Sequence, residues 1–268
     1  MMIKQILLRN HQINSVLKYF KTHNLGKRHF FSFFKIMDYA PWNIKKVIKR
    51  KAFYSYFIQK NDLCFDIGAN IGNHIHYYLC AGAKVIAVEP QRRCLKILNQ
   101  RYGNNKKVKV VEKAIGEEKK ENYLYVCDEI STLSTFSDKW KTEGRYSTKV
   151  HWSKTRKVDM ITLDHLIREF GNPKFCKIDV EGYELNVLKG LTKKIPYLSF
   201  EFTREFFEDA KKCINRILSL GSATFNLVAI NPFRFFFSKW VTPDLLYDAI
   251  NSIDEELLHD DIYVKISI

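Results

Sequence analysis

Beyond residue 62, short apolar runs alternate with stretches in which apolar residues recur every three or four positions. The short runs predict strands and the amphipathic stretches predict helices. Because the two alternate, we expect an α/β fold with a doubly wound, mainly parallel sheet and helices on both faces. The later strands stand closer together, which predicts one antiparallel strand. Strands are expected at 63–67, 84–88, 108–111, 122–126, 175–178, 198–202, 225–230 and 262–266, and helices at 73–80, 92–102, 163–170, 184–188 and 206–220.

Residues 1–60 have a different pattern of apolar and polar positions, which predicts a helical N-terminal extension to a domain at 61–268. Apolar residues form one helical stripe over 5–20, and a dense apolar patch follows at 29–37. Pro41 breaks this run, and a second helix is expected through 42–58.

Residues 128–157 also interrupt the pattern, because they are rich in Ser, Thr and Lys. A long polar insertion in a compact domain is typical of a lid, a binding loop or a disordered segment.

Charge separates the same two parts of the chain. The formal net charge of the 268 residues is +15, and residues 1–60 hold thirteen basic residues and one acid, Asp38. The domain at 61–268 is therefore nearly neutral. A basic helical extension favours a solvated cap, contact with an anionic membrane surface, or contact with nucleic acid.

The six cysteines form no C-x-x-C pair, which argues against a zinc site and suits a reducing compartment. The chain has no run of about 18 uncharged apolar residues, the length of a membrane-spanning helix. Its first residues lack the pattern of a cleavable signal peptide. These features predict a cytoplasmic protein, with a peripheral position at the inner membrane surface as an extension of that prediction.

The sequence F-D-I-G-A-N-I-G-N-H (65–74) carries the strongest chemical signal. A buried strand is followed by a glycine-rich turn and a helix, which is the unit that binds nucleotide-like ligands. Glu89 ends the next strand, 21 residues beyond Gly68, where an acid accepts hydrogen bonds from ribose hydroxyls. A dinucleotide site would have G-x-G-x-x-G, whereas here Asp66 precedes G-A-N-I-G and suits a cationic ammonium group. S-adenosylmethionine is therefore favoured over a dinucleotide.

A second set of acids follows the strand expected at 175–178. Asp179 and Glu181 stand at its carboxyl end, where open α/β sheets bind ligands. They are expected either to face the reacting groups or to cap the helix that starts near residue 183. Glu201, in the strand that follows, is expected either to be functional or to pair with Arg204.

These stretches resemble the FkbM-type S-adenosylmethionine-dependent methyltransferases. The similarity covers about residues 62–205, through F-D-I-G-A-N-I-G-N-H, V-I-A-V-E-P, V-E-K-A-I-G, I-T-L-D-H-L-I, K-I-D-V-E-G-Y-E-L-N-V-L-K-G and L-S-F-E-F. It implies a seven-stranded, Rossmann-like class I methyltransferase fold, and in most cases O-methylation of a sugar, glycan or small metabolite. No metal site is expected.

The resemblance also assigns residues to the cofactor. The loop with Asp66, Gly68, Asn70, Gly72 and Asn73 would hold the methionine part, and Glu89 the ribose. Ala114 and Ile115 would lie near the adenine. Asp179 and Glu181 would face the reacting centre, as the first choices of general base.

Two histidines are further candidates for the base. His151 lies in the polar insertion, and His74 begins the helix beside the expected cofactor site. Ser131, Thr132, Ser134, Trp140 and Trp152 are candidates to bind a polar, ring-shaped acceptor.

The basic extension keeps an alternative open, an RNA methyltransferase that uses it to bind nucleic acid. Against this alternative, D-V-E-G occupies the place of an N-P-P-Y-type motif after the fourth strand. The sequence makes no prediction of oligomeric state.

Overall fold

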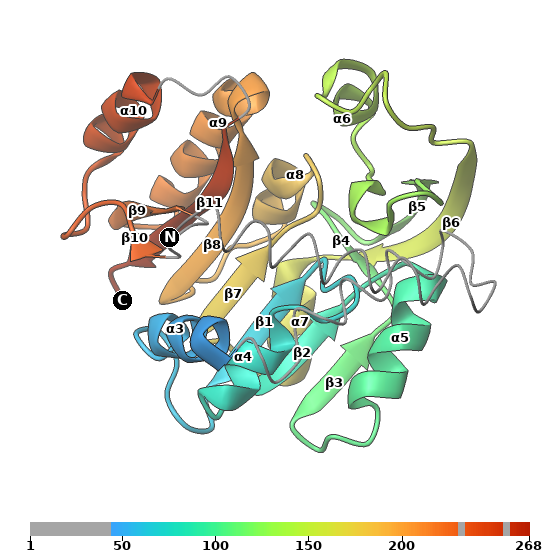
Figure 1. Cartoon of the computed structure of the whole chain (residues 1–268), viewed down its shortest axis with the longest axis horizontal. Helices are drawn as coiled ribbons and strands as arrows, with labels where there is room; N and C mark the ends of the chain where they lie inside the picture. Colours follow the sequence, from blue (N-terminus) through green and yellow to red (C-terminus); the bar gives the residue numbers. More distant parts are fainter. Residues whose placement is uncertain (1–43, 230–233, 254–257) are drawn as a thin grey trace, which may run out of the picture. The chain divides into compact units, whose positions relative to one another are not determined.

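The computed structural model describes residues 44–229, 234–253 and 258–268 (Figure 1). The helical stripe at 5–20 and the apolar patch at 29–37 lie outside the described residues. The chain forms two compact units, Met1–Lys49 and Arg50–Ile268. Helix α3 (Ile44–Tyr54) lies within the second helix expected from the sequence.

A central sheet of eight strands organises the larger unit, in the order β10-β9-β11-β8-β7-β1-β2-β3. Five neighbouring strands, from β8 to β3, are parallel, whereas β11 runs antiparallel to both of its neighbours. Its strands are β1 (Leu63–Ile67), β2 (Lys84–Val88), β3 (Val108–Val111), β7 (Phe175–Ile178), β8 (Tyr197–Thr203), β9 (Ala223–Ala229), β10 (Arg234–Phe235) and β11 (His259–Ile266). The predicted fold class is confirmed, and the two-residue β10 adds an eighth strand at the edge.

The central strands are buried on both faces, which is why they read as continuous apolar runs. Phe65 and Ile67 of β1 belong to the main apolar core, together with residues of α7, α8, α9 and α10. The helices of the larger unit cover both faces of the sheet, with α4 and α5 in front and α7 behind in Figure 1. They are α4 (Ile75–Cys80), α5 (Arg92–Tyr102), α6 (Asp138–Glu143), α7 (Leu163–Phe170), α8 (Glu184–Lys189), α9 (Phe207–Leu218) and α10 (Pro243–Ser252).

The residues after Arg50 pack into the larger unit, although the charge pattern grouped them with the extension. Tyr54 and Phe57 are almost fully buried. The Phe57 ring stacks on Phe175 of β7 and Tyr263 of β11, with centroids 5.2 and 5.3 Å away. The boundary between the units therefore follows aromatic packing rather than charge.

The predicted insertion is structured and joins a second, smaller sheet. This sheet has the order β4-β6-β5, from β4 (Ala114–Ile115), β5 (Lys120–Val126) and β6 (Lys154–Ile161). The last four residues of the expected insertion, 154–157, therefore belong to a strand. Between β5 and β6 the chain forms the short 3-10 helix η2 (Ser131–Leu133) and then α6.

Candidate functional site

The order of the central sheet fixes where a ligand can bind. From β1 the chain runs outward through β2 and β3, then returns on the other side of β1 to form β7. In α/β sheets, ligands bind at such a switch point, outside the carboxyl ends of the strands. Here the loops after β1 and β7 meet, because the amide of Asp179 donates to the carbonyl of Ile67 at 3.0 Å.

Gly68 makes this close approach possible. Its φ is +79°, and a Cβ at this position would lie 1.8 Å from the carbonyl oxygen of Asp179. Only glycine fits both the backbone conformation and the space. The Gly68 amide donates to the carbonyl of Val88, so the loop is attached to β2 as well.

A cavity opens at the switch point. It is lined by residues that follow β1, β2 and β7, by β4 at the edge of the second sheet, and by the segment around η2. Seven of the residues expected at the cofactor or reacting centre line it: Gly68, Asn70, Glu89, Ala114, Ile115, Asp179 and Glu181.

Glu89 is buried beside this cavity and held by two backbone amides. Its Oε2 accepts from the Asn70 amide at 2.8 Å, and its Oε1 accepts from the Gln91 amide at 2.7 Å. Burial raises the pKa of Glu89 to about 7, and these hydrogen bonds oppose the rise. Each carboxylate oxygen can accept a further hydrogen bond. The group is thus oriented to receive two hydroxyls.

Four predicted residues do not line the cavity: Asp66, Gly72, Asn73 and His151. Asp66 is 2% exposed, and its Oδ2 has no hydrogen-bond partner among the residues described. Burial raises the pKa of Asp66 to about 7, against the nearby charge of Lys177. A Cβ at Gly72 would lie 2.6 Å from the Tyr102 ring, so this glycine allows α5 to pack against the loop. His151 is exposed.

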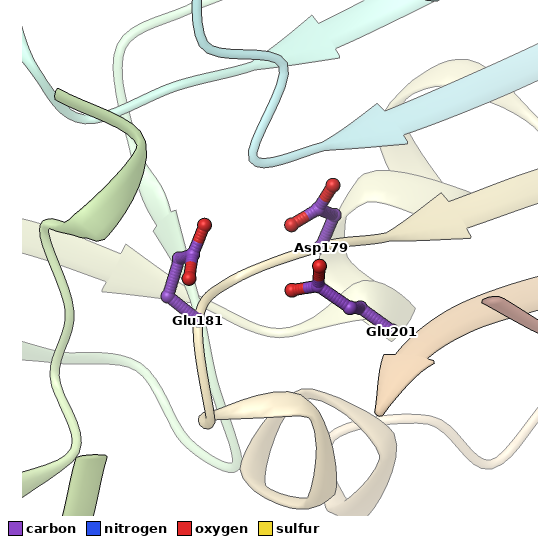
Figure 2. A group of neighbouring side chains, drawn as sticks. All are labelled: Asp179, Glu181 and Glu201. Atoms are coloured by element: carbon purple, nitrogen blue, oxygen red, sulfur yellow. The ribbon is translucent and has the colours of Figure 1, made fainter. Parts of the chain in front are cut away.

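Three carboxyl groups converge at the edge of the cavity. Asp179 and Glu181 come from the loop after β7, and Glu201 comes from β8. One oxygen from each lies within 4.8 Å of the others, and Figure 2 shows the three groups facing a common space. Loss of hydration raises the pKa of the half-buried Glu201, and the charges of Asp179 and Glu181 raise it further. Carboxylate oxygens at this spacing are also ligands that a hard divalent cation accepts.

A buried lysine supports this carboxylate cluster. Lys177 Nζ lies 3.1 Å from Asp179 Oδ2 and 3.0 Å from Asp261 Oδ1. Burial acts to lower the pKa of Lys177, but the two carboxylates outweigh it and raise the pKa well above its ordinary value. Lys177 therefore provides a positive charge beneath Asp179.

The structure gives specific hydrogen bonds for the residues named in these alternatives. Helix α8 has no side-chain cap, and the acid in its first turn is Glu184. Glu184 Oε1 accepts from the amides of Val180 and Gly182 and so fixes the loop that carries Glu181. Arg204 donates to the carbonyls of Ile250 and Ile253, whereas Glu201 faces the other two acids.

His74, the other histidine considered, is partly buried and does not line the cavity. Its Nδ1 forms a 2.8 Å hydrogen bond with Tyr54 Oη. Burial, and then the charges of Lys177 and Arg50, lower its pKa well below the ordinary value. It is therefore a neutral packing residue in this structure.

Several lining residues carried no signal in the sequence. Gln91 Nε2 donates to the carbonyl of Ser131, and Ser134 Oγ donates to Gln91 Oε1, both at 3.0 Å. Phe136 and Leu124 add apolar surface. Of the residues considered for the acceptor, Ser131, Thr132 and Ser134 line this cavity instead. Trp152 donates to the carbonyl of Leu133 and packs in a small core with Trp140.

Comparison with known proteins points to one family of methyltransferases. A family model described as the methyltransferase FkbM domain matches residues 66–225. The hexuronic acid methyltransferase AglP of Haloferax volcanii is 25% identical over 176 residues, which is 65% of this chain and 68% of AglP.

Solved methyltransferase structures show a more distant likeness. Fibrillarin of Aeropyrum pernix with bound S-adenosyl-L-methionine matches with a TM-score of 0.41 and 10% identity, over 78% of this chain and 68% of fibrillarin. An rRNA methylase of Streptococcus thermophilus matches with a TM-score of 0.43 and 10% identity, over 81% of this chain and 94% of the methylase. The family match spans more than half of this chain and includes the β1 loop, Glu89 and the three carboxylates. The chain belongs to the FkbM methyltransferase family, whose members use S-adenosylmethionine as the methyl donor.

Proposed function

We propose that this methyltransferase methylates a hydroxyl oxygen of a sugar or of a small metabolite. The carboxylate cluster of Asp179, Glu181 and Glu201 at the edge of the cofactor cavity carries this proposal. A hydroxyl is a weak nucleophile until its proton is removed, and a carboxylate within reach can remove it. The name of the relative from Haloferax volcanii, a hexuronic acid methyltransferase, supports a sugar acceptor.

The residues at the switch point fit S-adenosylmethionine. Gly68 and Asn70 line the cavity where the methionine part would lie. Glu89 would hold the ribose hydroxyls, and Ala114 and Ile115 would lie beside the adenine. When bound, the cofactor supplies a methyl group on a positively charged sulfur.

The cluster divides the remaining work. Asp179, already paired with Lys177 at 3.1 Å, orients the acceptor hydroxyl. Glu201 accepts its proton, because it lies in the same cluster as Asp179 and its raised pKa favours the protonated form that results. Glu181 lines the cofactor cavity and increases the negative charge around Glu201. The exposed His151 has no part in this scheme.

The cofactor assignment is tested by calorimetry with S-adenosylhomocysteine. Glu89→Ala removes the acceptors for two ribose hydroxyls. The dissociation constant of S-adenosylhomocysteine from this variant should therefore be about 10- to 100-fold higher than from the wild type. Glu112→Ala is the control, because Glu112 follows the neighbouring strand β3, is 57% exposed and lies outside the cavity. Equal binding by the two variants would refute the role of Glu89.

The proton-transfer assignment is tested by single-turnover methylation of an accepted glycoside. Glu201→Gln should reduce the rate about 10²- to 10⁴-fold with little change in S-adenosylhomocysteine affinity. Glu208→Gln, at an exposed glutamate of α9, should leave the rate unchanged. A full rate in Glu201→Gln would show that another group takes the proton.

A further inference from the structure

A second cavity adjoins the carboxylate cluster on the side away from the cofactor loop. Glu201 of the cluster lines it, and so does Gly182, the residue after Glu181. Trp140 of α6, Thr203 of β8 and Phe206 form other parts of its wall. The cluster therefore lies where the two cavities approach each other, which is the position that an acceptor hydroxyl must reach.

Two residues of this wall carry buried polar atoms that lack a partner. Trp140 is 4% exposed and Thr203 is 5% exposed. Neither Trp140 Nε1 nor Thr203 Oγ1 has a hydrogen-bond partner within the part of the chain that the structure describes. Unsatisfied buried groups are rare in native proteins, because each loses its hydration without compensation. A ligand with hydroxyl groups would satisfy both.

The other lining groups suit a sugar ring. The Trp140 and Phe206 rings lie 5.7 Å apart at an interplanar angle of 48° and offer an apolar surface. Glu201 and Thr203 are two residues apart on β8, so they share one face of the strand. Aromatic surface beside a few fixed polar groups is the usual composition of a small-molecule site. A pyranose presents both an apolar face and outward hydroxyls.

The charge of the cavity excludes an acidic ligand. Its wall includes the acids Glu184, Glu201 and Asp209. Lys139 is the cation in the described lining, and its Nζ is already 2.5 Å from Asp209. A carboxylate on the acceptor would therefore lie beside carboxyl groups, and the described lining offers it no unpaired cation.

We propose that this second cavity is the acceptor site and that it binds an uncharged hexopyranose, with Trp140 and Thr203 hydrogen-bonded to its hydroxyls. The cavity binds the uronic acid of the same sugar more weakly. The expected acceptor therefore differs from the hexuronic acid in the name of the relative from Haloferax volcanii. This inference rests on the proposed function.

The test follows the indole N–H resonance of Trp140, assigned with Trp140→Phe, in the full chain saturated with S-adenosylhomocysteine. The methyl glycopyranosides of glucose, galactose and mannose are titrated separately, each beside its uronic acid counterpart. We expect a saturable shift with at least one neutral glycoside and a dissociation constant at least 10-fold higher for its uronic acid. No shift with any of the three, or equal affinity for the acid, would overturn the proposal.

Thr203→Val separates binding from folding. The change removes an unsatisfied hydroxyl, so the melting temperature should stay equal or rise. The dissociation constant of the bound glycoside should still rise about 3- to 10-fold. Thr142→Val, at an exposed position of α6, is the control. A lower melting temperature with unchanged glycoside affinity would assign the hydroxyl a structural role and contradict the proposal.

Asp209→Asn tests the charge argument directly. The variant removes the carboxylate that pairs with Lys139, so Lys139 can bind an acidic ligand. The ratio of the dissociation constant of the uronic acid to that of the neutral glycoside should fall at least 3-fold. An unchanged ratio would contradict the charge argument. S-adenosylhomocysteine binding distinguishes the two levels of inference. Its failure in the intact protein would refute the proposed function, whereas cofactor binding without glycoside binding would refute only the acceptor site.

Discussion

At Gly68 the left-handed backbone and the nearby carbonyl of Asp179 act together against any side chain. Gly68→Ala should lower the free energy of unfolding by about 2–4 kcal/mol, because strain and steric overlap add. The same displacement of the loop should weaken S-adenosylhomocysteine binding more than 10-fold. Urea unfolding and calorimetry measure the two effects.

Gly171→Ala is the matched control for that variant. Gly171 has φ +97°, but its added Cβ would meet only Leu63 Cδ2, at 3.9 Å. This substitution strains the backbone without a steric overlap, so it should lower the free energy of unfolding by about 1–2 kcal/mol. It should leave S-adenosylhomocysteine binding unchanged. If both variants lost the same stability and bound equally, the contact between the two loops would be unimportant.

Asp66 makes stability depend on pH. Its pKa rises from 3.8 to about 7 on folding, so the folded state holds an extra proton between these values. The contribution of Asp66 to the free energy of unfolding is therefore greatest at low pH and falls by up to about 1.4 kcal/mol per pH unit as pH rises toward 7. Asp66→Asn has no carboxyl group to titrate at this position. The free energy of unfolding of this variant, relative to that of the wild type, should therefore increase from pH 5 to pH 7. A constant difference in urea unfolding across that range would contradict the assignment.

Individual residues were predictable where they directly follow a strand. Gly68, Glu89 and Asp179 do so, Glu181 stands two residues further on, and the carboxyl ends of parallel strands meet at one edge of the sheet. Trp140 and Thr203 were not predictable as a pair. They share a cavity only through tertiary packing, and an unsatisfied hydroxyl has no signature in sequence.

Among the elements, β7 and β11 lie on either side of β8 and are joined across it by an ion pair of the buried Lys177 with Asp261. Lys177→Met would leave Asp179 and Asp261 without their cation, so it should lower the free energy of unfolding by about 3–5 kcal/mol. Lys189→Met is the control, since Lys189 is 43% exposed and pairs with Glu117 at 3.3 Å. It should cost less than about 1 kcal/mol. Similar losses in urea unfolding would show that burial of the pair is irrelevant.

The elements of the central sheet were predicted well, whereas those of the small sheet were not. Strands β1, β2, β3 and β7 have the expected bounds, because most of their residues are apolar. Strand β6 begins with Lys-Thr-Arg-Lys, of which three residues are exposed. A strand that faces solvent has little apolar content, so its first half read as part of a polar insertion.

For the whole molecule, the position of the unit boundary has a direct consequence. Removal of residues 1–49 should leave the melting temperature of the remaining chain nearly unchanged, because Arg50–Ile268 is a compact unit. Removal of residues 1–60 also takes Tyr54 and Phe57, each buried and worth about 3–5 kcal/mol. Such a loss approaches the total stability of a domain, so this second product should not fold. Circular dichroism on heating would contradict the boundary if both products melted alike.

Charge follows the same division. Residues 1–49 hold ten basic residues and one acid, so they carry +9 of the total +15. No helix among the described residues is both long and apolar enough to span a bilayer. A solvated cap, contact with an anionic membrane surface and contact with nucleic acid all remain predictions for this basic segment.

Residues 131–140 line both cavities: Ser131, Thr132, Ser134 and Phe136 the first, Ser137, Lys139 and Trp140 the second. Thr135, between them, donates to the carbonyl of Glu181 at 2.6 Å. If one ligand orders this stretch and thereby changes the affinity for the other ligand, the second ligand changes the affinity for the first by the same factor, because linkage is reciprocal. Substitutions that alter acceptor choice here will thus also alter how tightly the spent donor is held, and with it the turnover of the enzyme.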